Sequence, residues 1–167
     1  SVSIAIRVKG RTEVGVVYDP IRNELFTAVR GEGAKLNDLR LRVENKRDLS
    51  GAVLATGFPF KQAKYMPMQF RMMESLIQEV ADFRRTGSAA LDLCYVAAGR
   101  VDGYFEYGIK AWDVAAGDLI VREAGGIVTD YHAGHGYLKA GHIVAAAPRV
   151  LKDMLNKIQP CLAEDLK

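Results

Sequence analysis

The sequence lacks the features that mark several large classes of protein. Its only two cysteines, Cys94 and Cys161, lie far apart and form no C-x-x-C pair. Cys94 falls in an apolar helical run, which is typical of a buried free thiol in a reducing cytosol. No apolar run approaches the roughly 18 to 20 residues that a membrane span needs. We therefore expect a cytoplasmic globular protein without a membrane partner.

A block of like charge is also absent. The 23 Lys and Arg residues are scattered and nearly balance the 20 Asp and Glu residues, giving a net charge of +3. This is well short of a nucleic-acid-binding footprint. A starting methionine is missing as well, because the chain opens on S-V-S-I-A-I-R-V-K-G, already in strand alternation. We expect that Ser1 is not the first residue of the native protein.

The order of predicted elements indicates an α/β layered sandwich. Strands joined by turns too short for a parallel crossover come first, and a short ribbon follows them; they span 1–8, 13–18, 24–30 and 34–43. Strands and helices then alternate, with strands at 52–56, 82–85, 101–107, 127–130 and 143–146, and helices at 67–81, 89–98, 112–124 and 149–158. This order predicts an antiparallel sheet followed by a mixed sheet flanked by helices.

We divide the chain into residues 1–47, the remainder of an N-terminal antiparallel half, and residues 48–167, a C-terminal α/β half, within one continuous unit. Helical spacing in 67–81 predicts a stripe of Phe70, Met73, Ile77 and Val80. Asp118 falls on a different helix face from Asp113, and we expect it to be solvated or to cap the helix.

Two carboxylates stand at the ends of the loop that enters the 112–124 helix, in F-E-Y-G-I-K-A-W-D from Phe105 to Asp113. Asp113 is explained either as a first-turn residue that satisfies free N–H groups and the helix dipole, or as an oxygen ligand for a hard cation such as Mg²⁺. Glu106 is either a solvated strand residue or an acceptor for ligand hydroxyls. If Phe105 faces the core, Glu106 points to the opposite surface.

The turn Gly87-Ser88-Ala89 precedes a helix. Ser88 is an N-cap there, and the free N–H groups would also favour an anionic or hydroxylated ligand. On the preceding strand, only one of Arg84 and Arg85 can point toward this turn. No zinc-protease motif surrounds the three histidines, His132, His135 and His142, and no serine-histidine-aspartate order is supported.

The stretch W-D-V-A-A-G-D-L-I-V-R-E-A-G-G-I-V-T-D resembles the C-terminal signature of the inositol monophosphatase family. Upstream segments agree, namely Y-D-P-I-R-N-E-L-F-T-A-V-R-G-E-G-A-K-L-N, A-T-G-F-P-F and R-R-T-G-S-A-A-L-D-L-C-Y-V-A-A-G-R-V-D-G-Y-F-E. The likeness covers nearly the whole chain and is closest to the bacterial SuhB type of this family.

The resemblance implies a Mg²⁺-dependent, lithium-sensitive phosphomonoesterase acting on inositol monophosphate or a related sugar phosphate. It implies that Asp113 is a metal ligand, that Glu106 accepts substrate hydroxyls and that Arg84 lies near the substrate. Gly87, Ser88 and Ala89 match the family's substrate-contacting turn. The family also makes a homodimer the expected assembly.

The same resemblance implies that the other metal ligands and the water-activating group precede the position of Ser1. Asp19-Pro20 is not the family's second metal motif, because Ile21-Arg22 follows it instead of Asp-Gly-Thr. We therefore expect no catalytic residue in this chain and no activity without the missing part. Two alternatives remain open, a regulatory protein that binds transcription-complex proteins or RNA, and a sister activity on bisphosphorylated nucleotides or fructose bisphosphate.

Overall fold

The first sheet is an antiparallel meander, as the short turns predict. In the computed structural model, which describes residues 1–166, five strands lie side by side in chain order. They are β1 (Val2–Val8), β2 (Arg11–Asp19), β3 (Glu24–Val29), β4 (Gly33–Leu36) and β5 (Leu39–Arg40). Strand β1 is therefore an edge strand, and its register against β2 shifts between Ile6 and Arg7.

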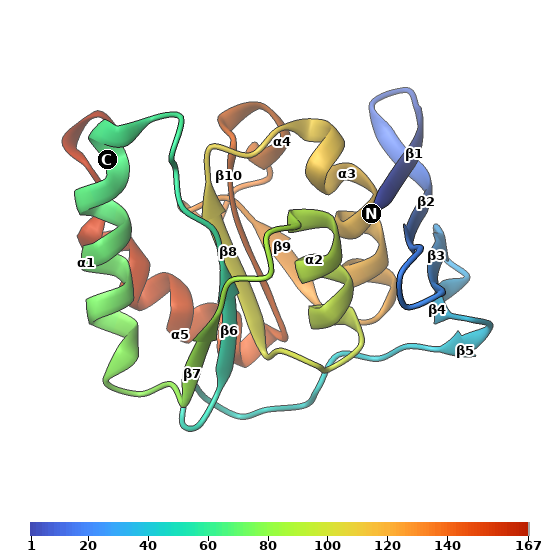
Figure 1. Cartoon of the computed structure of the whole chain (residues 1–167), viewed down its shortest axis with the longest axis horizontal. Coiled ribbons are helices and arrows are strands. Elements are labelled where there is room, and N and C mark those ends of the chain that lie inside the picture. The colour runs from blue at the N-terminus through green and yellow to red at the C-terminus, as the bar shows by residue number, and fades with distance from the viewer. Residues whose placement is uncertain (167) are drawn as a thin grey trace.

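The outer face of this sheet is apolar and open. Val2, Ile4 and Ile6 each expose about half of their surface. They lie opposite Tyr18, Val16 and Val14 of β2, which carry the same face onward toward β3. The inner face packs against helices, which lie on only one side of this sheet (Figure 1).

The second sheet is mixed, as predicted. Its strands are β6 (Val53–Thr56), β7 (Asp82–Arg84), β8 (Gly103–Tyr107), β9 (Ile127–Thr129) and β10 (His142–Ala146), in the order β7-β6-β8-β10-β9. Strand β6 runs parallel to both β7 and β8, whereas β10 runs antiparallel to β8 and β9. The carboxyl ends of β7, β6 and β8 consequently meet at one edge of the sheet.

Helices form two further layers (Figure 1). Helices α2 (Ala89–Ala97) and α3 (Ala111–Glu123) lie between the two sheets, and α1 (Met66–Ile77) and α5 (Pro148–Ile158) cover the far face of the second sheet. The shorter helices are α4 (Tyr137–Ala140), η1 (Ala63–Tyr65), η2 (Gln159–Cys161) and η3 (Glu164–Leu166). Within residues 1–166, none of the helices combines the length and apolarity needed to cross a membrane.

Both faces of the second sheet are buried, so its strands are apolar on both sides. Phe105 and Val144 belong to the core formed with α1 and α5, whereas Tyr104 and Ala145 belong to the core formed with α2, α3 and the first sheet. The alternation along β8 therefore directs even-numbered side chains toward the layer of α2 and α3.

Two predictions about helix faces are wrong. In α1 the buried residues include Met68, Met72 and Leu76, while Phe70 and Ile77 of the predicted stripe are exposed. Met73 packs partly against the core and Val80 is buried, but the helix ends at Ile77 instead of 81. Apolar residues occur on two adjacent faces of this helix, so spacing alone does not identify the face that packs.

Asp118 is buried instead of solvated. Its Oδ1 accepts hydrogen bonds from Arg122 Nε at 2.7 Å and from the Tyr137 hydroxyl at 2.9 Å. The partner from α4 comes from outside the helix, and helical spacing gives no sign of it. Asp118 therefore ties α3 to α4 and is neither solvated nor a helix cap.

Candidate active site

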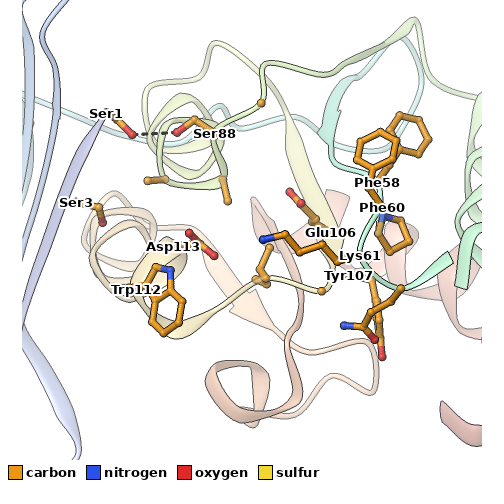
Figure 2. Close-up of a pocket in the computed structure, with 17 residues that line it drawn as sticks. Ser1, Ser3, Phe58, Phe60, Lys61, Ser88, Glu106, Tyr107, Trp112 and Asp113 are labelled. Atoms are coloured by element: carbon orange, nitrogen blue, oxygen red, sulfur yellow. Dashed lines mark hydrogen bonds between the residues drawn. The ribbon is translucent and has the colours of Figure 1, made fainter.

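A cavity of about 510 Å³ opens at the edge where the parallel strands end. This volume is typical of sites for small molecules, and the edge is where α/β sheets commonly bind ligands. Helices α2 and α3 both begin here, because each follows one of these strands. The lining comprises Ser1, Ser3, residues 58–62, residues 87–90, residues 106–109, Trp112 and Asp113 (Figure 2).

Asp113 occupies the first turn of α3, as predicted. Its Oδ2 accepts a hydrogen bond from the Lys110 backbone N–H at 2.8 Å. Its Oδ1 accepts no hydrogen bond from the described residues, 1–166, and the side chain lines the cavity. The helix-start role and a ligand role are therefore compatible, because each uses a different oxygen.

Glu106 lines the same cavity from the end of β8. It does point away from Phe105, but the face it reaches is covered by α2 and α3 and is not an open surface. The buried Tyr104 hydroxyl donates to Glu106 Oε2 at 2.6 Å. Burial raises the pKa of Glu106 and the Asp113 charge raises it further, while the Tyr104 hydrogen bond and the Arg85 charge lower it.

The predicted turn at the start of α2 lines a third side of the cavity, in addition to the sides formed by Asp113 and Glu106. Gly87 has a φ of +92°, a conformation that is cheap only for glycine. Ser88 is the N-cap, as predicted, and its Oγ accepts from the Leu91 N–H at 3.4 Å. Ala89 follows as the first helical residue. The first N–H groups of a helix have no partner inside the helix, so this wall offers donors to a ligand.

A second buried carboxylate, that of Asp92, hydrogen-bonds the residue that precedes this turn. Asp92 is almost fully buried in α2, and its Oδ1 accepts from the Thr86 hydroxyl at 2.6 Å. Burial raises the pKa of Asp92 to about 6, the negative charge of Glu106 adds to this rise, and the Thr86 hydrogen bond opposes it. Thr86 directly precedes Gly87, so this bond fixes the chain as it enters the turn.

The structure turns the two arginines in different directions. Arg84 hydrogen-bonds the Asp82 carboxylate and the Phe83 carbonyl, and neither arginine is among the residues that line the cavity. Arg85 Nη1 lies 2.8 Å from the position that a Cβ on Gly87 would take. Of the pair, Arg85 is therefore the residue beside the turn, whereas the resemblance points to Arg84.

Several residues around the cavity were not found from the sequence. The exposed Lys61 reaches in from the loop after β6, and its amino group points into the space between Glu106 and Asp113 (Figure 2). Tyr104 acts from the core, and Gly57 lies against the Glu106 carboxylate. The only sequence signal for Lys61 is its position directly after the G-F-P-F segment.

The donor set fits Mg²⁺ as one part of a coordination shell. Asp113 Oδ1 is a hard oxygen donor of the kind that Mg²⁺ prefers. Within residues 1–166, no group of three or more His, Cys, Asp or Glu side chains could hold a metal ion. The histidines do not form a metal cluster, and His142 Nδ1 accepts a hydrogen bond from the Tyr131 N–H. This chain thus places one carboxylate oxygen of the kind that binds Mg²⁺ in the same cavity as the carboxylate of Glu106.

Comparison with known proteins agrees with this geometry. The model of the inositol monophosphatase family matches residues 1–164. The "Nus factor SuhB" of Pasteurella multocida is 80% identical over all of this chain, which covers 62% of that protein. The chain therefore spans less than two thirds of the length of this relative.

Solved structures give the same result for the fold. The extragenic suppressor protein suhB from Bartonella henselae superposes with a TM-score of 0.91 at 43% identity, covering 94% of this chain and 60% of that one. Inositol monophosphatase from Anabaena (Nostoc) sp. PCC 7120 gives a TM-score of 0.90 at 36% identity, covering 99% of this chain and 68% of that one. The layered arrangement of the two sheets is thus that of these proteins.

Proposed function

The chain belongs to the inositol monophosphatase family, and on this premise we propose that it forms the substrate-orienting side of a Mg²⁺-dependent phosphomonoesterase. The substrate is inositol monophosphate or a related sugar phosphate. One observation carries the proposal: Glu106 and Asp113, from different elements, line the same cavity as the N-terminal turn of α2.

Each wall has a separate task. Glu106 Oε1, which accepts no hydrogen bond from the described residues, accepts hydroxyl groups of the polyol. Residues 87–89 provide N–H donors at the start of α2, and Lys61 brings positive charge to the phosphate. Asp113 supplies one oxygen ligand to Mg²⁺, which would provide charge neutralisation and an acidified water molecule for phosphoryl transfer. The family's other metal ligands lie outside this chain.

The test is a phosphatase assay on a protein of the relatives' full length. Phosphate release from inositol 1-phosphate should require Mg²⁺, be inhibited by Li⁺ and exceed release from fructose 1,6-bisphosphate and from a nucleoside 3′,5′-bisphosphate. The 167-residue chain alone should be inactive, because one carboxylate cannot hold the metal ions of this chemistry. The proposal fails if Mg²⁺ leaves the rate unchanged or if a bisphosphate is the preferred substrate.

A second function is favoured by the name of the Pasteurella relative, a Nus factor. We propose that the protein also binds components of a transcription complex, either proteins or RNA. Affinity capture with purified transcription factors and with RNA tests this proposal. An Asp113→Asn variant that loses phosphatase activity but retains binding would separate the two functions, whereas absence of binding in the unmodified protein would reject this one.

We further propose that the protein is a cytoplasmic homodimer. Cys94 and Cys161 are both free thiols, as a reducing compartment requires. Sedimentation equilibrium on the full-length protein tests the assembly, and a monomeric mass throughout the micromolar range would contradict it.

A further inference from the structure

Gly57 lies directly against the carboxylate of Glu106. A Cβ placed on Gly57 would overlap Cδ, Oε1 and Oε2 of Glu106, at separations that real Cβ atoms do not show. The backbone of Gly57 does not need the left-handed conformation, because its φ lies outside that region. The missing side chain at position 57 therefore serves to leave space for Glu106.

The surroundings determine which partner would have to move. Thr56, the preceding residue, is buried, and its hydroxyl bonds the Phe105 carbonyl oxygen at 2.7 Å and receives a bond from Gln69 Nε2 at 2.9 Å. These bonds fix the end of β6 to β8 and to α1. The Glu106 carboxylate, in contrast, is the terminal group of a side chain with several rotatable bonds. A methyl group at position 57 would therefore displace that carboxylate and not the strand.

Tyr104 holds the same carboxylate from the core side. The Tyr104 side chain is fully buried, and its hydroxyl donates to Glu106 Oε2 at 2.6 Å. This bond occupies one carboxylate oxygen and leaves Oε1 for a ligand. Other glycines differ in kind: a Cβ on Gly117 would meet the packed Leu93 side chain at 2.7 Å, so substitution there would disturb the core.

We infer that Gly57 and Tyr104 are positioning residues that set substrate selectivity, the first by leaving room for the Glu106 carboxylate and the second by fixing its Oε2. The identity of the ligand, a polyhydroxylated phosphate ester, rests on the proposed function. The placement of the carboxylate rests on the geometry alone.

The experiment measures kcat and KM of full-length Gly57→Ala on inositol 1-phosphate and on p-nitrophenyl phosphate, which has no ring hydroxyls. We expect kcat/KM for the inositol ester to fall about 10- to 100-fold, the factor typical of hydrogen bonds to a charged acceptor, mainly through KM. The loss on p-nitrophenyl phosphate should be much smaller. In a Glu106→Ala background, Gly57→Ala should have little further effect, because there is no carboxylate left to displace.

A matched control is Gly134→Ala, whose Cβ would also meet a carboxylate, that of Asp130 at 2.8 Å, but away from the cavity. It should cost stability without changing the ratio between the two substrates. If Gly57→Ala does not fold, Tyr104→Phe, which removes only the hydroxyl, should give the same selective loss. Equal losses on both esters in the folded variant would overturn the inference.

A second readout does not require activity. If the unmodified protein hydrolyses no phosphate ester, the proposed function fails, yet crystal structures of the protein and of Gly57→Ala still test the positioning roles. We expect the Glu106 carboxylate to leave the Tyr104 hydroxyl while β6 stays in place. A retained Tyr104–Glu106 bond in Gly57→Ala would overturn the inference.

Discussion

The two carboxylates of the cavity are held in contrasting ways. Glu106 is fixed by the interior of this chain, through the Tyr104 hydroxyl on one side and the bare backbone of Gly57 on the other. Asp113 is fixed through a single local bond from Lys110 N–H, and its second oxygen has no partner in residues 1–166. The orientation of Glu106 is thus a consequence of packing, whereas the ligand role proposed for Asp113 requires further metal ligands that residues 1–166 do not supply.

For the proposed function, this difference separates selectivity from turnover. A wall built from buried strands can distinguish among substrates without a metal ion, because its acceptor is already oriented. A lone carboxylate at a helix start contributes to rate only when the rest of a metal shell is present. Substitutions on the two walls should therefore have effects of different kind as well as different size.

The largest expected effect comes from Asp113→Asn in the full-length protein. We expect phosphatase activity to fall by about 10³-fold or more, because electrostatic stabilisation dominates phosphoryl transfer. The asparagine oxygen can still accept from Lys110 N–H, so the melting temperature should hardly change. Asp113→Ala is the control, since it should lose activity and also about 1 kcal/mol of stability with the cap. Near-native turnover in Asp113→Asn would remove this residue from the mechanism.

The second-largest effect is expected from the titration of Asp92, the buried carboxylate that accepts the Thr86 hydrogen bond. Its native pKa of about 6 exceeds the unfolded value of 3.8. Between pH 3.8 and 6 the Asp92 carboxyl is protonated in the native state but largely ionised in the unfolded state. The contribution of Asp92 to the free energy of unfolding is therefore greatest below pH 4 and is lost as pH rises through 6. At about 1.4 kcal/mol per pKa unit, the loss approaches about 3 kcal/mol.

Asp92→Asn should remove this pH dependence while still accepting the Thr86 bond. Urea unfolding of both proteins at pH 4.5 and 7.5 measures it. The stability of the unmodified protein relative to the variant should decline toward pH 7.5, and an equal difference at both pH values would contradict the prediction.

A smaller effect is expected from the titration of Glu106. Its pKa is raised, so its carboxylate is protonated at a higher pH than that of an ordinary glutamate. As pH falls through this raised pKa, the affinity for the inositol ester should fall about tenfold per pH unit, since the acceptor is lost. The p-nitrophenyl phosphate profile is the internal control, and Glu106→Gln should abolish the difference between the profiles. Identical profiles in the unmodified protein would exclude this role.

The smallest effect is expected at Lys61, which lines the cavity but is exposed. Lys61→Met should raise KM for both esters by about two- to fivefold, because an exposed charge is largely screened by salt. The increase should disappear at 0.5 M NaCl. A salt-independent increase would indicate that Lys61 acts by direct contact instead of by its charge.

Much of this arrangement could be predicted from local patterns. The alternation and short turns of residues 2–40 indicate the meander, and Ser88 and Asp113 stand where helix starts prefer such residues. These inferences depend only on residues that are close together in the sequence. The fold class and the presence of both carboxylates at one site follow from them and from the family resemblance.

The supports of the site depend on contacts between distant segments. In the sequence, Tyr104 is indistinguishable from an ordinary core aromatic. No residue near Gly57 in the sequence indicates that the Glu106 carboxylate occupies the space where a side chain at position 57 would lie. Strand alternation allows either Arg84 or Arg85 to face the turn. Strand β7 pairs with β6 so that Arg84 lies beside Ala55, yet it is Arg85 whose Nη1 approaches Gly87. Such pairings are fixed by tertiary packing, so local pattern cannot supply them.

The apolar outer face of the first sheet has a practical consequence for work with this chain in isolation. Strand β1 presents unpaired backbone groups along its free edge and half-exposed Val2, Ile4 and Ile6 on its outer surface. Such an edge is a template for intermolecular strand addition, although the irregularity at Ile6–Arg7 limits the straight length available. The weight-average mass of the 167-residue chain, measured by light scattering, should therefore increase with concentration, and Ile4→Lys should suppress that increase.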